Sequence, residues 1–193
     1  MNIEASLIAL PSFETNRLIL RKININDLDD IYEFSSDPKV AHHMTWEVNK
    51  TKEETLHNFV SIVIEKYKTG QSADWAIVHK ESNKVIGTCS FVDWSNNNQK
   101  AEIGYVLNRN YWGQGLVSEA IKEVIKFGFE TLELNRIEGG CDTDNIGSEK
   151  VMLKAGFKYE GTLRKNEYIK GEFRDTKVYS IIKEDFFLNR INI

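Results

Sequence analysis

Apolar and polar residues alternate along Thr15–Ile23, which predicts a half-buried strand at the start of the domain. Two segments with helical spacing follow it. The first is capped by Asn26 and Asp27 and ends before Pro38, because the residue that precedes a proline is steered out of the helical conformation. The second opens at Thr51 with a capping-box pattern. The pattern therefore predicts one strand followed by two amphipathic helices.

Three further strands are predicted between residues 72 and 107. Ser72–His79 and Val85–Trp94 flank a run of turn residues at 81–84, and a second turn at 95–98 leads into the strand that ends at Leu107. Strands joined by such short turns are typical of an antiparallel meander.

The last strand of the meander breaks at two closely spaced glycines directly into an amphipathic helix that runs from about Gly115 to Glu130. Gly113 and Gly115 let the backbone approach a ligand, and the free N–H groups of the first helical turn, from about Gln114 to Val117, can point at one phosphate. We therefore expect a phosphorylated ligand at this junction. The alternative is an ordinary turn whose glycines only permit tight packing.

The same loop comes within one residue of a dinucleotide-binding fingerprint, with Ser118 in place of the third glycine. The preceding strand carries Glu102, whereas the first strand of a doubly wound sheet is buried on both faces and reads as a continuous apolar run. Nicotinamide or flavin binding is therefore disfavoured.

A strand–helix–strand unit is predicted across the glycine-rich loop. Asn135–Cys141 has the character of a strand, and the helix after it ends at Gly156. A right-handed crossover places the strand that ends at Leu107 beside the strand that contains Arg136. We expect the ligand cleft at the carboxyl ends of these two strands.

Composition and charge exclude several classes of protein. The 193 residues, 41% hydrophobic and 28% charged, predict a single domain over residues 1–193. The net charge of −4 gives no sign of a basic face for nucleic acid. Cys89 and Cys141 lack metal or redox spacing and suggest a reducing, cytoplasmic location. No apolar run reaches membrane length, the start is not typical of a signal peptide, and we expect no metal site.

Short motifs follow one another in a specific order: Glu102–Tyr105, Tyr111–Gly115, Ser118–Ala120, Asn145 with Ser148, Gly156–Phe157, Glu160–Gly161, and Asp175 with Tyr179. In this order and spacing, the chain resembles the GNAT superfamily of acyl-CoA-dependent N-acyltransferases, and within it the RimJ and RimL type of ribosomal-protein N-terminal acetyltransferase. The resemblance covers a core of about residues 15–184. It implies an α/β fold in which helices flank a central mixed, mostly antiparallel sheet, and a splayed pair of parallel strands forms the CoA cleft.

The resemblance also implies acetyl-CoA as co-substrate. Asn110–Gly115 is similar to the family's pyrophosphate loop, with Asn110 where Arg or Gln is usual. The pantetheine arm would pair with Tyr105–Leu107 almost as an added strand, and Asn145 would hold its far amide. Without the family pattern, Asn145 is equally a helix cap. The residues expected to bind the co-substrate are Tyr105, Val106, Leu107, Tyr111, Trp112, Gly113, Gln114, Gly115, Leu116, Val117, Asn145 and Ser148.

Acetyl transfer to an amine needs a base for the amine and a proton donor for the departing thiolate. The resemblance implies Glu167 as the base and Ser148 as the donor, with Glu102 as a rival base. The structural alternatives are an exposed strand-edge glutamate for Glu167, a helix cap for Ser148 and an ion-paired sheet residue for Glu102. Met152 has no proton to give where many members place an acidic tyrosine. A backbone N–H near Val106 would meet the oxyanion.

Other residues offer weaker candidates. Adjacent His42 and His43 in a polar loop are simply solvated in the plainest interpretation, although related enzymes shape their acceptor pocket here. Tyr168 is another possible proton donor. Cys141 lies at a strand end near the cleft, but no base is visible beside it in the sequence, so a covalent acyl-cysteine route is disfavoured.

We therefore expect direct transfer of an acetyl group from acetyl-CoA to a primary amine in a ternary complex, with a protein N-terminus as the acceptor. The alternatives are an acetyltransferase of small amines, such as a polyamine or an aminoglycoside, and a non-catalytic acyl-CoA sensor. The sequence names no acceptor and leaves a homodimer open. Residues 1–14 are expected to be either a disordered lead or part of an interface.

Overall fold

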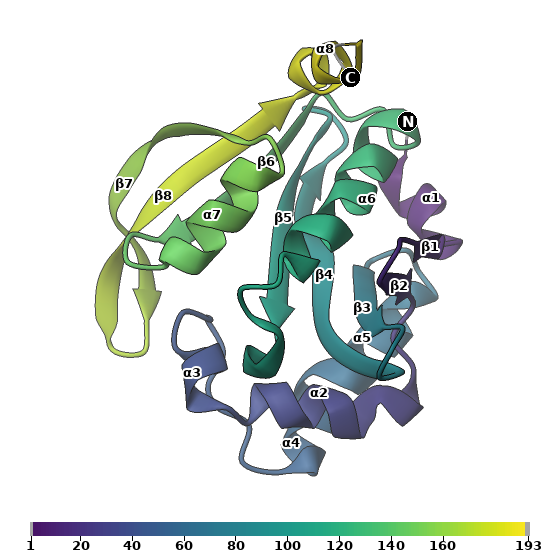
Figure 1. Ribbon diagram of the computed structural model, residues 1–193, viewed down its shortest axis with the longest axis vertical. Coiled ribbons are helices and arrows are strands. Elements are labelled where there is room, and N and C mark those ends of the chain that lie inside the picture. The colour runs from purple at the N-terminus through teal and green to yellow at the C-terminus, as the bar shows by residue number, and fades with distance from the viewer. Residues whose placement is uncertain (1, 192–193) are drawn as a thin grey trace.

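The computed structural model describes residues 2–191 and shows one twisted sheet with helices on both faces (Figure 1). Its eight strands have the order β1-β2-β3-β4-β5-β6-β8-β7. Every neighbouring pair is antiparallel except β5–β6, which is parallel. The strands are β1 (Phe13–Glu14), β2 (Leu18–Arg21), β3 (Ala73–His79), β4 (Lys84–Ser95), β5 (Lys100–Leu107), β6 (Arg136–Asp142), β7 (Lys158–Ile169) and β8 (Glu172–Ile182).

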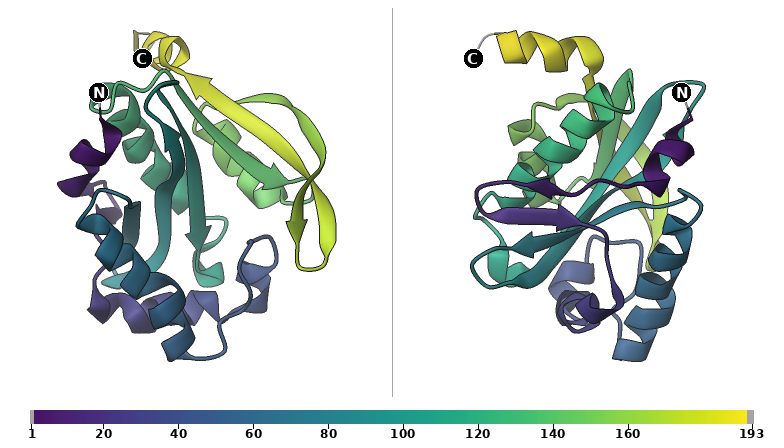
Figure 2. Two further views of the ribbon diagram at one scale, coloured as in Figure 1. Left: turned by 180° about the vertical axis from the view of Figure 1, so that it is seen from behind. Right: turned by 90° about the vertical axis from the view of Figure 1, so that its right-hand side faces the viewer.

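The helices lie in two layers. Helices α6 and α7 cover one face of the sheet and α5 lies on the other, as the front and back views show (Figures 1 and 2). The α-helices are α1 (Ile3–Ile8), α2 (Leu28–Ser35), α3 (Pro38–Ala41), α4 (Lys52–Thr55), α5 (Ser61–Tyr67), α6 (Leu116–Glu130), α7 (Ile146–Lys154) and α8 (Lys183–Ile191). Short helical segments are η1 (Ile25–Asp27), η2 (Leu56–Val60) and η3 (Arg109–Tyr111). This α/β arrangement confirms the predicted fold class.

Local sequence signals account for several helix boundaries. Helix α2 ends at Ser35, ahead of Pro38 as predicted, but Asp37 then caps the short α3 by accepting a hydrogen bond from the Lys39 N–H. At the predicted capping box, the Thr51 hydroxyl accepts from the Glu54 N–H at 3.2 Å. These side chains pair backbone N–H groups that the first turn of a helix leaves free.

Aromatic side chains fill the core between the sheet and α6. Trp75 is fully buried and contacts the rings of Phe91 and Phe127 at centroid distances of 6.3 and 5.8 Å. The Trp75 indole N–H is paired with the Pro11 carbonyl oxygen at 2.7 Å. The core therefore fixes α6, and with it the glycine-rich loop, against the sheet.

The parallel pair β5–β6 is splayed. It is hydrogen-bonded only where Lys100–Glu102 faces Arg136–Glu138, although β5 continues to Leu107 and β6 to Asp142. Beyond that point β5 stays with β4 and β6 stays with β8. The predicted crossover is confirmed, and the strands open toward their carboxyl ends (Figure 1).

The N-terminal segment belongs to the core of the domain, which corrects the expectation of a disordered lead. Leu7 of α1 is fully buried, and the Glu4 carboxylate accepts hydrogen bonds from the Trp94 Nε1 at 2.7 Å and the Asn96 Nδ2 at 2.9 Å. Across residues 2–191, no helix has the length and apolar character needed to span a membrane.

Candidate functional site

A cleft of about 870 Å³ opens where β5 and β6 part. Its walls come from the end of β5, the start of α6, helix α7, and helix α3 with the loop after it. All of the predicted co-substrate residues line it except Gln114, which is exposed beside the loop. Segments far apart in the sequence thus form one elongated site.

The glycine-rich loop has the backbone that the sequence suggests. Gly113 and Gly115 both have φ +75°, a left-handed conformation that favours glycine, and a Cβ on either would meet nothing within 4 Å. No side chain caps the N-terminus of α6, whose Gly115 precedes the helix. Open space therefore lies over uncapped N–H groups at the positive end of a 15-residue helix. This cradle fits the diphosphate of a CoA ester.

Three lysines also line the cleft. Lys39 comes from α3, and Lys150 and Lys154 come from α7. None of the three is among the site residues predicted from the sequence. The spacing of Lys150 and Lys154, four residues apart on one helix, is a signal that could have indicated a shared face.

Tyr105 and Ser148 form a hydroxyl pair across the cleft. The Tyr105 hydroxyl lies 2.8 Å from the Ser148 Oγ and donates to the Ser148 carbonyl oxygen at 3.1 Å. Burial raises the pKa of Tyr105, so its hydroxyl keeps its proton at neutral pH. The sequence predicted both residues in the site, but their contact links strand β5 to helix α7 and was not predicted.

Asn145 caps α7 and also lines the cleft. Its Oδ1 accepts from the Ser148 N–H at 3.0 Å, which leaves the Ser148 hydroxyl outside the capping bond. The two interpretations of Asn145 are therefore compatible, and Ser148 is held in place through its backbone.

Glu102 and Glu167 lie away from the cleft lining. Glu102 is half-buried on β5, and burial, followed by the nearby Glu138, Glu167 and Asp93 carboxylates, raises its pKa. Glu167 is exposed on β7 and faces Arg174 across the β7–β8 pair. The two carboxylates share an electrostatic environment on the sheet but do not touch the Tyr105–Ser148 pair.

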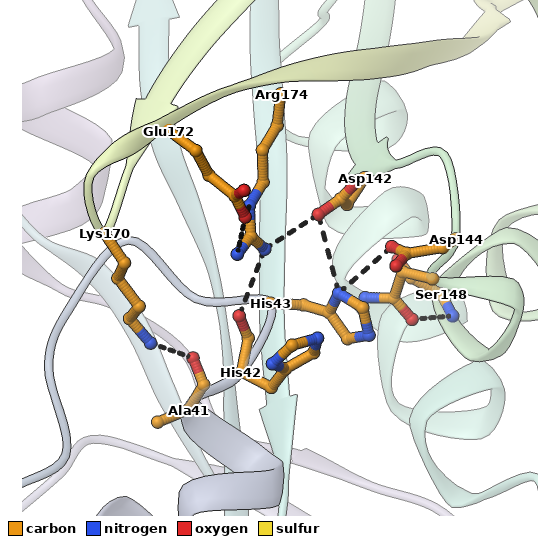
Figure 3. Close-up of polar contacts among 10 residues, drawn as sticks. Ala41, His42, His43, Asp142, Asp144, Ser148, Lys170, Glu172 and Arg174 are labelled. Carbon is orange, nitrogen blue, oxygen red and sulfur yellow. Dashed lines mark hydrogen bonds and ion pairs between the residues drawn. The ribbon is translucent and has the colours of Figure 1, made fainter.

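The loop after α3 is tied to the β7–β8 hairpin (Figure 3). Lys170 Nζ donates to the Ala41 carbonyl oxygen at 2.5 Å, and Arg174 Nη1 donates to the His42 carbonyl oxygen at 3.3 Å. Both His42 and His43 line the cleft. His42 is exposed, in line with the expectation of a solvated side chain, whereas His43 is half-buried, which differs from it.

His43 lies against two carboxylates from the end of β6 and the following turn (Figure 3). Its Nδ1 is 3.7 Å from Asp142 Oδ2 and 3.6 Å from Asp144 Oδ1. Arg174 Nη1 binds the same Asp142 oxygen at 2.9 Å. The nitrogen of His43 and the carboxylate oxygens of Asp142 and Asp144 all lie within 4.8 Å of one another, which is close enough for them to share a metal ion.

Cys141 is buried beside this region. Burial, followed by the Glu149 carboxylate, raises the pKa of its thiol to about 11. A thiol that keeps its proton is a poor nucleophile. The structure therefore gives no support to an acyl-cysteine route.

Comparisons with known proteins agree with this geometry. Residues 17–158 match the family model described as "Acetyltransferase (GNAT) domain". The chain is 37% identical over 172 residues to the uncharacterized N-acetyltransferase p20 of Bacillus licheniformis, a match that covers 89% of this chain and 96% of that protein.

Two further proteins are similar over most of the chain. The ribosomal-protein-serine acetyltransferase of Escherichia coli (strain K12) is 29% identical, with 86% of this chain and 92% of that protein covered. The crystal structure of the Microcin C7 self immunity acetyltransferase MccE in complex with acetyl-CoA and AMP superposes with a TM-score of 0.78 at 26% identity. That match covers 87% of this chain and 93% of MccE.

Proposed function

Because the chain belongs to the GNAT family and is an acetyl-CoA-dependent acetyltransferase, we propose that it acetylates the N-terminal amine of a protein. The similarity to the ribosomal-protein-serine acetyltransferase supports this acceptor class. We propose a cytoplasmic location because Cys89 and Cys141 are both free thiols.

The observation that favours a protein acceptor is an exposed aromatic pair on the β7–β8 hairpin. Tyr168 and Phe173 are 66% and 63% exposed, and their ring centroids are 4.9 Å apart. The same hairpin holds the cleft wall through Lys170 and Arg174. Exposed aromatic rings beside a site are typical of surfaces that bind another protein.

Each part of the cleft has a task in this proposal. Gly113, Gly115 and the N-terminus of α6 hold the diphosphate, and the free edge of β5 at Tyr105–Leu107 pairs with the pantetheine arm. Acetyl-CoA supplies an activated acyl group as a thioester. A backbone N–H near Val106, on the edge of β5 that faces the cleft, is assigned to the carbonyl oxygen of that group.

We assign the proton of the departing sulfur to Ser148. The Tyr105 hydroxyl, 2.8 Å away, can pass its proton on to Ser148 as Ser148 donates, and it regains a proton from the acylated amine nitrogen. Glu102 and Glu167 are the carboxylates that the family resemblance suggests for deprotonating the amine.

A small polyamine is the second candidate acceptor. Burial, followed by the carboxylates of Glu138, Glu167 and Asp93, raises the pKa of Glu102, and these carboxylates give this part of the sheet an excess of negative charge. Such a potential attracts any cationic amine.

The test is thiol release from acetyl-CoA against peptides that begin with Ser, Ala or Met, spermidine, an aminoglycoside and a ribosomal-protein extract. Mass spectrometry locates the acetyl group. We expect it on a peptide or ribosomal-protein N-terminus, and acetylation of spermidine or the aminoglycoside alone would contradict a protein acceptor.

The variant Tyr168→Ala sharpens this test. We expect it to raise KM for a protein acceptor and to leave the affinity for acetyl-CoA unchanged, because Tyr168 lies outside the cleft lining. An unchanged KM for the protein acceptor would remove the hairpin from the proposed acceptor surface.

A further inference from the structure

His43 has one edge in the protein and one edge toward the cleft. Its Nδ1 is buried and has no hydrogen-bond partner among the described residues, yet two carboxylate oxygens lie 3.6 and 3.7 Å away. The side chain is 24% exposed and belongs to the cleft wall. Since Nδ1 is inaccessible, the exposed part of the ring is the edge that carries Nε2.

From this placement we propose that His43 is the general base that takes the proton from the acceptor amine, with Asp142 and Asp144 as its positioning residues. This inference rests on the proposed acetyl transfer. A carboxylate beside Nδ1 favours the tautomer that carries its proton on Nδ1, which leaves Nε2 to accept a proton. Hydrogen bonds of this kind are often long in a ligand-free site and shorten when substrate binds.

The end of β6 contacts both His43 and Ser148. Cys141 interacts with the Ser148 side chain, and the next residue, Asp142, binds Arg174 and faces His43. Successive side chains of a strand point to opposite faces of the sheet. His43 and Ser148 are therefore both held at the carboxyl end of β6.

Position also favours His43 over the two glutamates. His43 and Ser148 line the same cleft, whereas Glu102 and Glu167 do not. A general base must reach the proton that it removes, directly or through one water molecule.

The surroundings favour a base over a metal ligand. The Asp142 Oδ2 that faces His43 already binds the Arg174 guanidinium at 2.9 Å. A metal cation on that oxygen would lie beside a fixed positive charge, which disfavours its binding. The charged and titratable groups around His43 are Asp142, Asp144, Arg174, Glu172, Lys170 and His42, with Lys39, Lys150 and Lys154 along the cleft.

The protons and bonds balance in this scheme. The acceptor ammonium gives one proton to His43 Nε2, and the amine nitrogen bonds to the acetyl carbon as the carbon–sulfur bond breaks. A second proton of the amine reaches the sulfur through Ser148, and the third stays on the amide. His43 then releases its proton to solvent.

The variant His43→Gln tests the proposal, with His57→Gln as the matched control on the exposed surface of η2. The acceptors are peptides with N-terminal Ser or Ala. We expect kcat/KM of His43→Gln to fall by roughly 10²-fold or more. We also expect the loss of rate on acidification to disappear, added imidazole to restore part of the rate, and acetyl-CoA affinity to stay unchanged. The control should behave as wild type.

Variants of the positioning residues extend the test. Asp144→Asn and Asp142→Asn should shift the acidic limb of the pH–rate profile, and loss of packing alone would lower the rate without moving that limb. If all peptides and amines fail with the wild-type enzyme, the proposed function is wrong. If the wild type is active and His43→Gln keeps its rate and pH profile, the assignment of His43 is wrong. Loss of activity on chelation, restored by zinc, would also overturn it in favour of a metal site.

Discussion

Gly115 is the residue whose backbone is most directly tied to co-substrate binding. Its φ of +75° is costly for a residue with a Cβ, and Gly115→Ala should lose about 1 kcal/mol of unfolding free energy. The added methyl group would stand in the open space of the cradle, so acetyl-CoA affinity should fall as well. Calorimetric titration and urea unfolding measure the two effects.

Gly171 provides the matched control for this variant. It has φ +89° and open space around its Cβ direction, but it lies in the β7–β8 turn outside the cleft lining. Gly171→Ala should show a similar loss of stability with unchanged acetyl-CoA affinity. Equal losses of affinity in both variants would mean that backbone strain, rather than the cradle, controls binding.

Ser148 and Tyr105 should act as a pair. Ser148→Ala keeps the α7 cap, because Asn145 binds the backbone N–H, so stability should change little. We expect kcat to fall by roughly 10²-fold if Ser148 supplies the proton. The double variant with Tyr105→Phe should lose less than the sum of the two single effects, since the hydroxyls form one relay. Strict additivity in a double-mutant cycle would contradict the relay.

At the scale of elements, α1 contributes to the stability of the whole domain. Leu7 is fully buried whereas its neighbour Ile8 is 51% exposed. Leu7→Ala should cost about 3 kcal/mol of unfolding free energy, and Ile8→Ala should cost less than about 0.5 kcal/mol. Urea unfolding of the two variants tests whether α1 packs on the core. If the N-terminal segment were disordered, the two variants would have the same unfolding free energy.

Strands β6, β7 and β8 are joined by a carboxylate with a strongly lowered pKa. Hydrogen bonds from Arg136, and then from Ser180, lower the pKa of Glu160 from 4.5 to about 2. The stability that ionised Glu160 contributes is therefore fully present above pH 4.5. It is lost as the pH falls from about 4.5 to about 2. The stability difference between wild type and Glu160→Gln should shrink across that window, as followed by thermal unfolding. A constant difference would contradict the role of this ion pair.

The elements that the sequence predicted carry a local signal. Helix α6 has one buried face, so apolar residues recur at a helical spacing, and β5 alternates in burial along most of its length. Strands β3 and β4 are buried on both faces over most of their length and are delimited by the turn residues between them. Strand β7 is exposed along almost its whole length and has no such alternation. It is held by pairing with β8, which involves the backbone and leaves no hydropathy signal. The six-residue α1 is too short to show a helical repeat.

At the scale of the whole molecule, the sequence named many of the residues that line the cleft but not the contacts between residues far apart in the chain. Gly113, Gly115 and Asn145 carry local signals of a turn or a cap. His43 and Asp142 lie 99 positions apart, and only the path of the hairpin and the α3 loop brings them together. The Tyr105–Ser148 contact likewise depends on how α7 packs beside β5. Sequence spacing holds no information on such contacts.

The most direct test of the account is transfer of an isotope-labelled acetyl group from acetyl-CoA to a peptide with an N-terminal serine, followed by intact-mass and fragment analysis of peptide and enzyme. We predict the label on the peptide's terminal nitrogen, with free CoA formed in equal amount and no label on the enzyme. Label retained on Cys141, or binding of acetyl-CoA without transfer to this or any other amine, would contradict direct transfer in the cleft between β5 and β6.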